Sequence, residues 1–290
     1  MYESVMLGAV TGLMFSFVAL GFVLTFITTK TLNFALGEFM AIAGFVALGL
    51  ASVSWIPAVL VFAGAIAVPA LLGGATYHVL VRPFAGGSGH DVRWLLTTVA
   101  LSFVLLNLLI NGQSAKVRVL DVPTADGFAT LLGVTYSKQL LVIAGLAVVV
   151  VTAAHLVLEK TSVGVKMRAV SEDPEMASLA GISPRAVAIG TWIAAMAVAG
   201  LVGVLWSSYA GLSPRMGLAL LIGAFAVAVI GGLTSVPGVL LGGLIYGITT
   251  YVTGYQFGAA WGDVAGLALV VVVLVLRPHG LLGRRVEVKV

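Results

Sequence analysis

Long stretches without a single charged residue constrain this chain more than any other feature of its sequence. A soluble domain carries about 25% charged residues, whereas this chain of 290 residues has 9% and a mean hydropathy of +1.15. About 20 apolar residues cross the hydrocarbon core of a bilayer as a helix. The sequence therefore predicts an all-α, polytopic membrane protein. Its uncharged stretches are 4–29, 39–81, 94–115, 139–158, 186–214 and 216–262.

This composition excludes several classes of protein. A soluble enzyme, a nucleic-acid-binding domain and a disordered tail would each need far more charged residues. The chain has no cysteine, which excludes disulfides, iron–sulfur clusters and thiol catalysis. Its four histidines show no metal-ligand spacing, so we expect no metal site. Only Glu3 is charged before Lys30, so we expect the first stretch to be a retained span rather than a cleaved signal peptide.

The two longest uncharged stretches must be divided at turn signals. One break falls at the Ser-Trp-Ile-Pro sequence of 54–57, and the other at the Ser-Val-Pro-Gly sequence of 235–238. Stretch 39–54 is short for a full crossing and could be re-entrant. We therefore expect eight to nine spans, and the side of the N-terminus stays open. The predicted spans are 4–29, 39–54, 57–81, 94–115, 139–158, 186–213, 216–236, 238–256 and 259–276.

Basic residues indicate which loops face the cytoplasm, because cytoplasmic loops are enriched in Lys and Arg. Eleven of the 15 basic residues fall in segments 30–38, 82–93, 159–185 and 277–290. The other four fall in the intervening loops. This distribution predicts that those four segments, including the C-terminus, are cytoplasmic.

Small residues four apart let membrane helices approach closely. We expect such pairs to pack helices of the same chain, and a contact between subunits is the alternative. We found no tandem repeat or low-complexity linker, so we expect one transmembrane domain over residues 1–290. The pairs are Gly8 with Gly12, Gly238 with Gly242, and Gly243 with Gly247.

The cytoplasmic segment 159–185 carries eight charges in a very apolar chain. Asp173 is a favourable N-cap, and Pro174 suits the first helical position. Gly181 suits the left-handed residue that ends a helix. The spacing therefore predicts a two-turn helix over 174–180.

This short helix would be marginal alone in water and needs a docking surface. Met176, Leu179 and Ala180 form a small apolar stripe along it. The stripe could pack on the cytoplasmic face of its own chain. Alternatively, it could protrude and fit a groove on a soluble partner. Spacing alone favours neither reading.

Four stretches resemble one known family. The segment Gly164–Ile182 resembles the cytoplasmic loop of branched-chain amino acid ABC transporter permeases, with its Gly-x-x-x-Arg-Ala and Pro-Glu-x-Ala elements. Leu32–Phe39 resembles the Asn-Phe-Ala-x-Gly-Glu signature of that family, and Arg277–Gly283 its Arg-Pro-x-Gly-Leu-x-Gly terminus. Residues 224–238 resemble a further apolar run of the same family, which in this chain ends in the Ser-Val-Pro-Gly sequence. The four follow the expected order, and the chain is similar to the LivH-like subfamily.

Two positions depart from the family pattern. Leu36 stands where the family often has His, and Gly223 stands where a Lys is common. A role that depends on either of those side chains therefore does not transfer to this chain.

The resemblance implies the membrane-spanning half of an ABC importer, with no enzymatic activity and no cofactor of its own. Its partners would be a second permease subunit (a sibling or a copy), two cytoplasmic ATPases that bind ATP and Mg²⁺, and an extracytoplasmic substrate-binding protein. The chain has no Gly-Lys dipeptide and hence no P-loop. The ATPase-coupling residues implied are Glu172, Asp173, Pro174, Glu175, Met176, Leu179 and Gly181.

Polar residues inside the apolar stretches are candidates for the substrate path, because they are costly to keep among lipid. Thr98 and Ser102 form one strip, and Asn107 and Asn111 form another roughly opposite by helical angle. Hydrogen bonding between helices is the simpler explanation of these four residues. Asn33 and Glu38 could flank a broken helix or simply cap a loop. The candidate path residues are Asn33, Glu38, Thr98, Ser102, Asn107 and Asn111.

The function expected is import of a small polar solute into the bacterial cytoplasm across the inner membrane. Branched-chain or related amino acids are the first candidates, while urea and short amides stay open. The rival hypothesis is an autonomous secondary transporter or channel for small neutral solutes. It differs in one feature, because an autonomous carrier has no need of the docking helix at 173–181.

Overall fold

The fold was analysed in a computed structural model that describes residues 1–53, 55–84, 93–113, 117–118, 120, 127–131 and 133–283. Parts of two segments predicted to be cytoplasmic, 85–92 and 284–290, lie outside the described residues.

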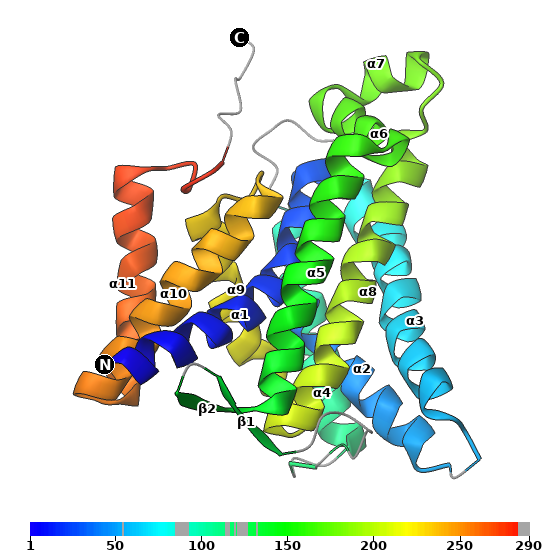
Figure 1. Ribbon diagram of the computed structural model, residues 1–290. Coiled ribbons are helices and arrows are strands. Elements are labelled where there is room, and N and C mark those ends of the chain that lie inside the picture. The colour runs from blue at the N-terminus through cyan, green and yellow to red at the C-terminus, as the bar shows by residue number, and fades with distance from the viewer. Residues whose placement is uncertain are drawn as a thin grey trace. The chain divides into compact units, whose positions relative to one another are not determined.

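The described chain consists almost entirely of helices, as the sequence predicts (Figure 1). Two irregular turns, the π-helix η1 and the 3₁₀-helix η2, extend α3. The elements in chain order are α1 (Tyr2–Thr29), α2 (Leu36–Ala51), α3 (Ala58–Thr76), η1 (Tyr77–Val81), η2 (Arg82–Phe84), α4 (Arg93–Gln113), β1 (Phe128–Leu131), β2 (Val134–Ser137), α5 (Lys138–Lys160), α6 (Ser162–Glu172), α7 (Pro174–Leu179), α8 (Pro184–Ala210), α9 (Met216–Gly231), α10 (Val236–Phe257) and α11 (Ala259–Leu276).

The membrane crossings agree closely with the predicted spans. Within the described residues, seven helices are long and apolar enough to cross a bilayer, and α2 and α9 are shorter apolar helices. At 1.5 Å per residue, the 16 residues of α2 reach about 24 Å, less than the hydrocarbon thickness of about 30 Å. The expectation of eight to nine crossing or re-entrant helices, with a short second one, is confirmed.

Helix α9 is shorter than predicted. It ends at Gly231, whereas the sequence predicts a span reaching residue 236. Gly232 has a φ of +102°, a left-handed conformation that ends the helix. Ser235 then starts α10, because its hydroxyl accepts a hydrogen bond from the Gly238 amide at 3.1 Å.

A small antiparallel hairpin, β1 with β2, was not predicted. Its register pairs Leu131 with Val134 across the turn. Val134 and Tyr136 are buried on one face, which is the alternation typical of a half-buried strand. That alternation and the glycine at position 133, which adopts a φ of +79° in the turn, were the features by which the sequence could have indicated the hairpin.

The chain divides into two compact units, which are described separately. Unit 1 comprises Met1–Val23, Ala125–Leu156 and Ile222–Val290, and unit 2 comprises Leu24–Thr124 and Val157–Leu221.

In unit 1, glycines bring the first part of α1 against α10. A Cβ on Gly8 would lie 2.7 Å from the Gly247 carbonyl oxygen, and one on Gly12 would collide with the Gly243 carbonyl. The Ser16 hydroxyl bonds across the same contact to the Val239 carbonyl at 2.9 Å. The predicted glycine pairs therefore pack helices of one chain, as expected.

In unit 2, α2, α3 and α8 pack side by side, and α4 contacts α2 (Figure 1). Small residues again allow close approach, because Gly203 of α8 rests on the backbone of Met40 and Gly200 rests on Pro69. Trp192 of α8 is fully buried, with its ring 5.5 Å from that of Tyr77. Helices α6 and α7 are attached at the N-terminal end of α8.

Candidate functional site: an exposed docking helix and a buried polar cluster

The docking helix predicted at 174–180 is present as α7, which starts at Pro174 as predicted and ends at Leu179, with Ala180 as its C-cap. The Asp173 carboxylate accepts hydrogen bonds from the amides of Glu175 and Met176 at 2.9 and 3.0 Å. Pro174 occupies the first turn, where its missing N–H is harmless. Gly181, at φ +78°, ends the helix in the left-handed conformation. The capping pattern therefore predicts the start of the helix and, to within one residue, its end.

The apolar stripe of α7 faces outward. Met176 is 63% exposed and Leu179 is 82% exposed, whereas Ala177 on the opposite side is buried. The stripe therefore does not pack against the described part of its own chain. The sequence leaves open whether the stripe packs on its own chain or protrudes from it, and in the structure it protrudes.

The helix before α7 is held firmly at its start. A Cβ on Gly164 would collide with the Leu158 carbonyl at the end of α5, so the two helices meet backbone to backbone. The Arg168 guanidinium donates a hydrogen bond to that same carbonyl. On the other side, the Ser183 hydroxyl accepts from the Ala186 amide at 3.3 Å and begins α8. α7 is therefore presented on an ordered support.

Four of the six predicted path residues gather where α2 begins. Asn33 is fully buried, and its side-chain oxygen accepts a hydrogen bond from the Ala35 amide at 3.0 Å. Glu38 lies in the first turn of α2 and is 1% exposed. From α4, the Ser102 side chain lies near the Glu38 carboxylate, and the Thr98 hydroxyl lies 3.5 Å from the Leu32 carbonyl.

The Glu38 carboxyl group is incompletely satisfied. Its Oε2 atom is buried and has no hydrogen-bond partner among the described residues. A buried, unpaired carboxyl oxygen is costly. Asn33 also reaches the sulfur of Met196 in α8 at 3.4 Å, a weak interaction. The cluster is thus a polar site with unused acceptor capacity inside an apolar unit.

The remaining two path candidates lie elsewhere. Asn107 and Asn111 are exposed, on the face of α4 opposite to buried Thr98. The Asn107 side chain donates to the Phe103 carbonyl of its own helix at 2.8 Å. The predicted angular separation of the two strips is present, and it places the two pairs in different environments.

Together these features define a multi-pass helical membrane protein with a capped helix exposed between two of its spans. The family described as branched-chain amino acid transport system, permease component, matches residues 4–276. The chain belongs to this family.

Curated relatives match over nearly the whole chain. The branched-chain amino acid transport permease BraD of Pseudomonas aeruginosa is 28% identical over 96% of this chain and 94% of its own length. LivH of Methanocaldococcus jannaschii, described as a probable permease of the same kind, is 29% identical over 91% of this chain and 87% of its own. LivH of Escherichia coli K12 is 28% identical over 96% of this chain and 94% of its own length. A solved structure, PsaBC from Streptococcus pneumoniae in complex with Fab, aligns with a TM-score of 0.49 at 14% identity, covering 93% of this chain and 90% of that chain.

Proposed function

We propose that this chain is the membrane-spanning permease subunit of an ABC importer for branched-chain or related amino acids. It works as one permease domain in the bacterial inner membrane, with its C-terminus in the cytoplasm. ATP and Mg²⁺ bind to two cytoplasmic ATPase partners, and an extracytoplasmic binding protein delivers the solute. A second permease subunit, a sibling or a copy, completes the translocation unit. Family membership supports this proposal.

The single observation that carries the ATPase coupling is the outward-facing stripe of α7. An apolar residue that is 82% exposed on an ordered cytoplasmic helix is suited to a partner's groove. The start of the helix is surrounded by Glu172, Asp173 and Glu175. Its limits are set by Pro174 and Gly181. The side chains that would enter the groove are those of Met176 and Leu179.

Uptake into proteoliposomes tests this function. When the vesicles also contain the ATPases, the second permease subunit and the binding protein, we expect leucine uptake that requires ATP hydrolysis by the ATPases. Without ATP, uptake should fall to the rate of protein-free vesicles, because the chain has no energy source of its own. Full-rate uptake by this chain alone, without ATP, would contradict the importer and support the autonomous carrier.

We further propose that the buried cluster of Asn33, Glu38, Thr98 and Ser102 contributes to the substrate path. Glu38 is its central group, because its free oxygen could accept a hydrogen bond from the ammonium group of an amino acid. Asn107 and Asn111 would line a path only at a surface that α4 shares with a second subunit.

Glu38→Gln should lower amino acid uptake about tenfold, because the amide keeps the shape of the side chain but cannot pair with an ammonium group. The lower end of the range for a charged hydrogen bond, about 1.5–3 kcal/mol, corresponds to a loss of this size. Transport should be measured as uptake per assembled complex. The matched control is Glu3→Gln, which makes the same change on an exposed side chain and should leave uptake unchanged. Equal uptake by both variants would remove Glu38 from the path.

A further inference from the structure

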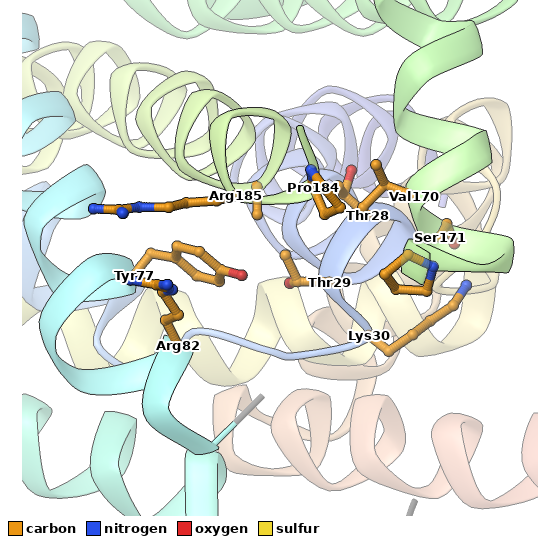
Figure 2. Close-up of a pocket in the computed structure, with 11 residues that line it drawn as sticks. Thr28, Thr29, Lys30, Tyr77, Arg82, Val170, Ser171, Pro184 and Arg185 are labelled. Carbon is orange, nitrogen blue, oxygen red and sulfur yellow. The ribbon is translucent and has the colours of Figure 1, made fainter. Parts of the chain in front are cut away.

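Two groups of polar side chains in unit 2 lie outside the buried cluster. The first lines a cavity of about 580 Å³ beside the start of α7 (Figure 2). The charged ends of Lys30 and Arg185 point to opposite sides of this cavity, and Arg185 contacts the His78 ring, with Nη2 3.1 Å from Nε2. These cations are therefore not directed at one bound group. The second group, Asn107 and Asn111, lies on the exposed face of α4.

The exposed face of α4 carries a narrow row of residues, here called the α4 seam. Its members are Leu96, Ala100, Phe103, Asn107 and Asn111, which are all exposed and follow one another at intervals of three or four positions. On a helix of 3.6 residues per turn, these positions fall within an arc of about 80°. This spacing is typical of the row along which two helices pack side by side.

The rest of the described chain leaves this row uncovered. Helix α4 packs chiefly on α2 and η1. Among the seven candidate spans of the described residues, it has the smallest buried share. Phe103 is 63% exposed in consequence. The α4 seam therefore faces either lipid or another protein.

Asn107 favours a protein over lipid. With 21 residues, α4 is about 31 Å long, which matches a hydrocarbon thickness of about 30 Å. Asn107 lies six residues before the end of the helix at Gln113, and hence about 9 Å inside that end. One N–H of its amide donates to the Phe103 carbonyl. Within the described part of the chain, its second N–H and its Oδ1 atom have no partner. Polar groups left unpaired in lipid are costly.

A second copy of the chain supplies the missing partner at the right depth. Two copies that cross the bilayer in the same orientation are related by a twofold axis along the membrane normal, so each residue meets its own counterpart at one depth. An asparagine amide is self-complementary, because it both donates and accepts hydrogen bonds. No residue from 94 to 113 is charged. Pairing the two seams therefore brings no like charges together along this stretch.

We propose that two copies of this chain associate along the α4 seam, with Asn107 of each copy hydrogen-bonded to Asn107 of the other. Hydrogen bonds of this kind hold membrane helices together, and a polar residue within a helix seam also fixes its register. Asn111, one turn nearer the helix end, would pair in the same way. This proposal rests on the proposed function, because it assigns the place of the second permease subunit to a copy.

Disulfide crosslinking tests the contact directly. The chain has no cysteine, so a single introduced thiol reports contacts between copies without background. Ala100→Cys places that thiol in the α4 seam and leaves Asn107 intact. Membranes that contain this chain alone are oxidised with copper phenanthroline, and the dimer is measured by non-reducing electrophoresis. We expect most of the Ala100→Cys protein to form a disulfide-linked dimer.

Val272→Cys is the matched control for position. Val272 is 51% exposed on α11, and both residues lie 13 positions from the predicted extracytoplasmic end of their helix. It should stay monomeric. Dimer formation by Ala100→Cys no greater than by Val272→Cys would overturn the proposal. A crosslink that forms only to a different, co-expressed permease would assign the α4 seam to a sibling and would also overturn it.

A second variant tests the role of the amide. Adding Asn107→Leu to Ala100→Cys should slow dimer formation about tenfold. Thr152→Leu is its control, because it removes a polar side chain from an exposed position of α5 and should leave the rate unchanged. An unchanged rate with Asn107→Leu, or an equal fall with Thr152→Leu, would contradict the assignment. Crosslinking requires neither ATP nor leucine, so its failure is distinguishable from a failure of uptake.

Discussion

Replacing Met176 and Leu179 together by aspartate is expected to abolish ATP-driven uptake while leaving the chain folded. Both side chains are well exposed, so the substitutions remove no internal packing. Surface changes of this kind usually alter the free energy of unfolding by no more than about 0.5 kcal/mol. Two carboxylates placed in an apolar groove would each lose their solvation without a partner, which costs several kcal/mol. Association with the ATPases should therefore fall at least a hundredfold.

Copurification with the ATPases and ATP-dependent uptake measure this effect. The matched control is Val163→Asp with Val165→Asp, because these side chains of α6 are also exposed, at 53% and 54%. The control should assemble and transport normally. A folded Met176→Asp, Leu179→Asp protein that still copurifies and transports would exclude α7 as the coupling helix.

Replacing Gly12 by leucine should prevent the folded chain from accumulating in the membrane. Any Cβ at this position would collide with the Gly243 backbone, and backbone atoms cannot move aside as a flexible side chain can. Overpacking costs about 1–3 kcal/mol even where neighbours can adjust. Here the cost should be at the upper end or beyond, because α1 would have to separate from α10 and would lose the bond from Ser16 to Val239.

The yield of monodisperse protein and its unfolding temperature report this effect. Gly190→Ala is the control, since a Cβ at this position in α8 meets nothing within 4 Å. It should be neutral or stabilising by up to about 1 kcal/mol, because alanine favours the helix. Normal yield of Gly12→Leu would mean that the α1–α10 contact is not needed for folding.

Much of the fold could be predicted from local rules. A helix in lipid must satisfy its own backbone, so uncharged stretches translate directly into spans. The ends of α7 followed from Asp173, Pro174 and Gly181, whose effects act within a few residues. The hairpin after α4 was missed because four-residue strands give a weak pattern beside long apolar stretches. The end of α9 was missed because an internal Gly-Gly pair resembles ordinary membrane-helix composition.

The sites depended on tertiary structure that local rules do not reach. The helical period of α4 predicts that Thr98 and Asn107 lie on opposite faces of the helix. Which of the two faces is buried depends on the helices that pack against α4. The sequence gives no sign that Ser102 approaches Glu38 across 64 positions.

Helix α8 joins the two parts of the candidate site mechanically. Its first turn begins just after α7, and Met196, which contacts Asn33, lies 12 residues further along the same helix. That separation is about 18 Å of continuous helix. A displacement of α7 would therefore be transmitted along this unbroken helix to Met196, which contacts the Asn33 side chain.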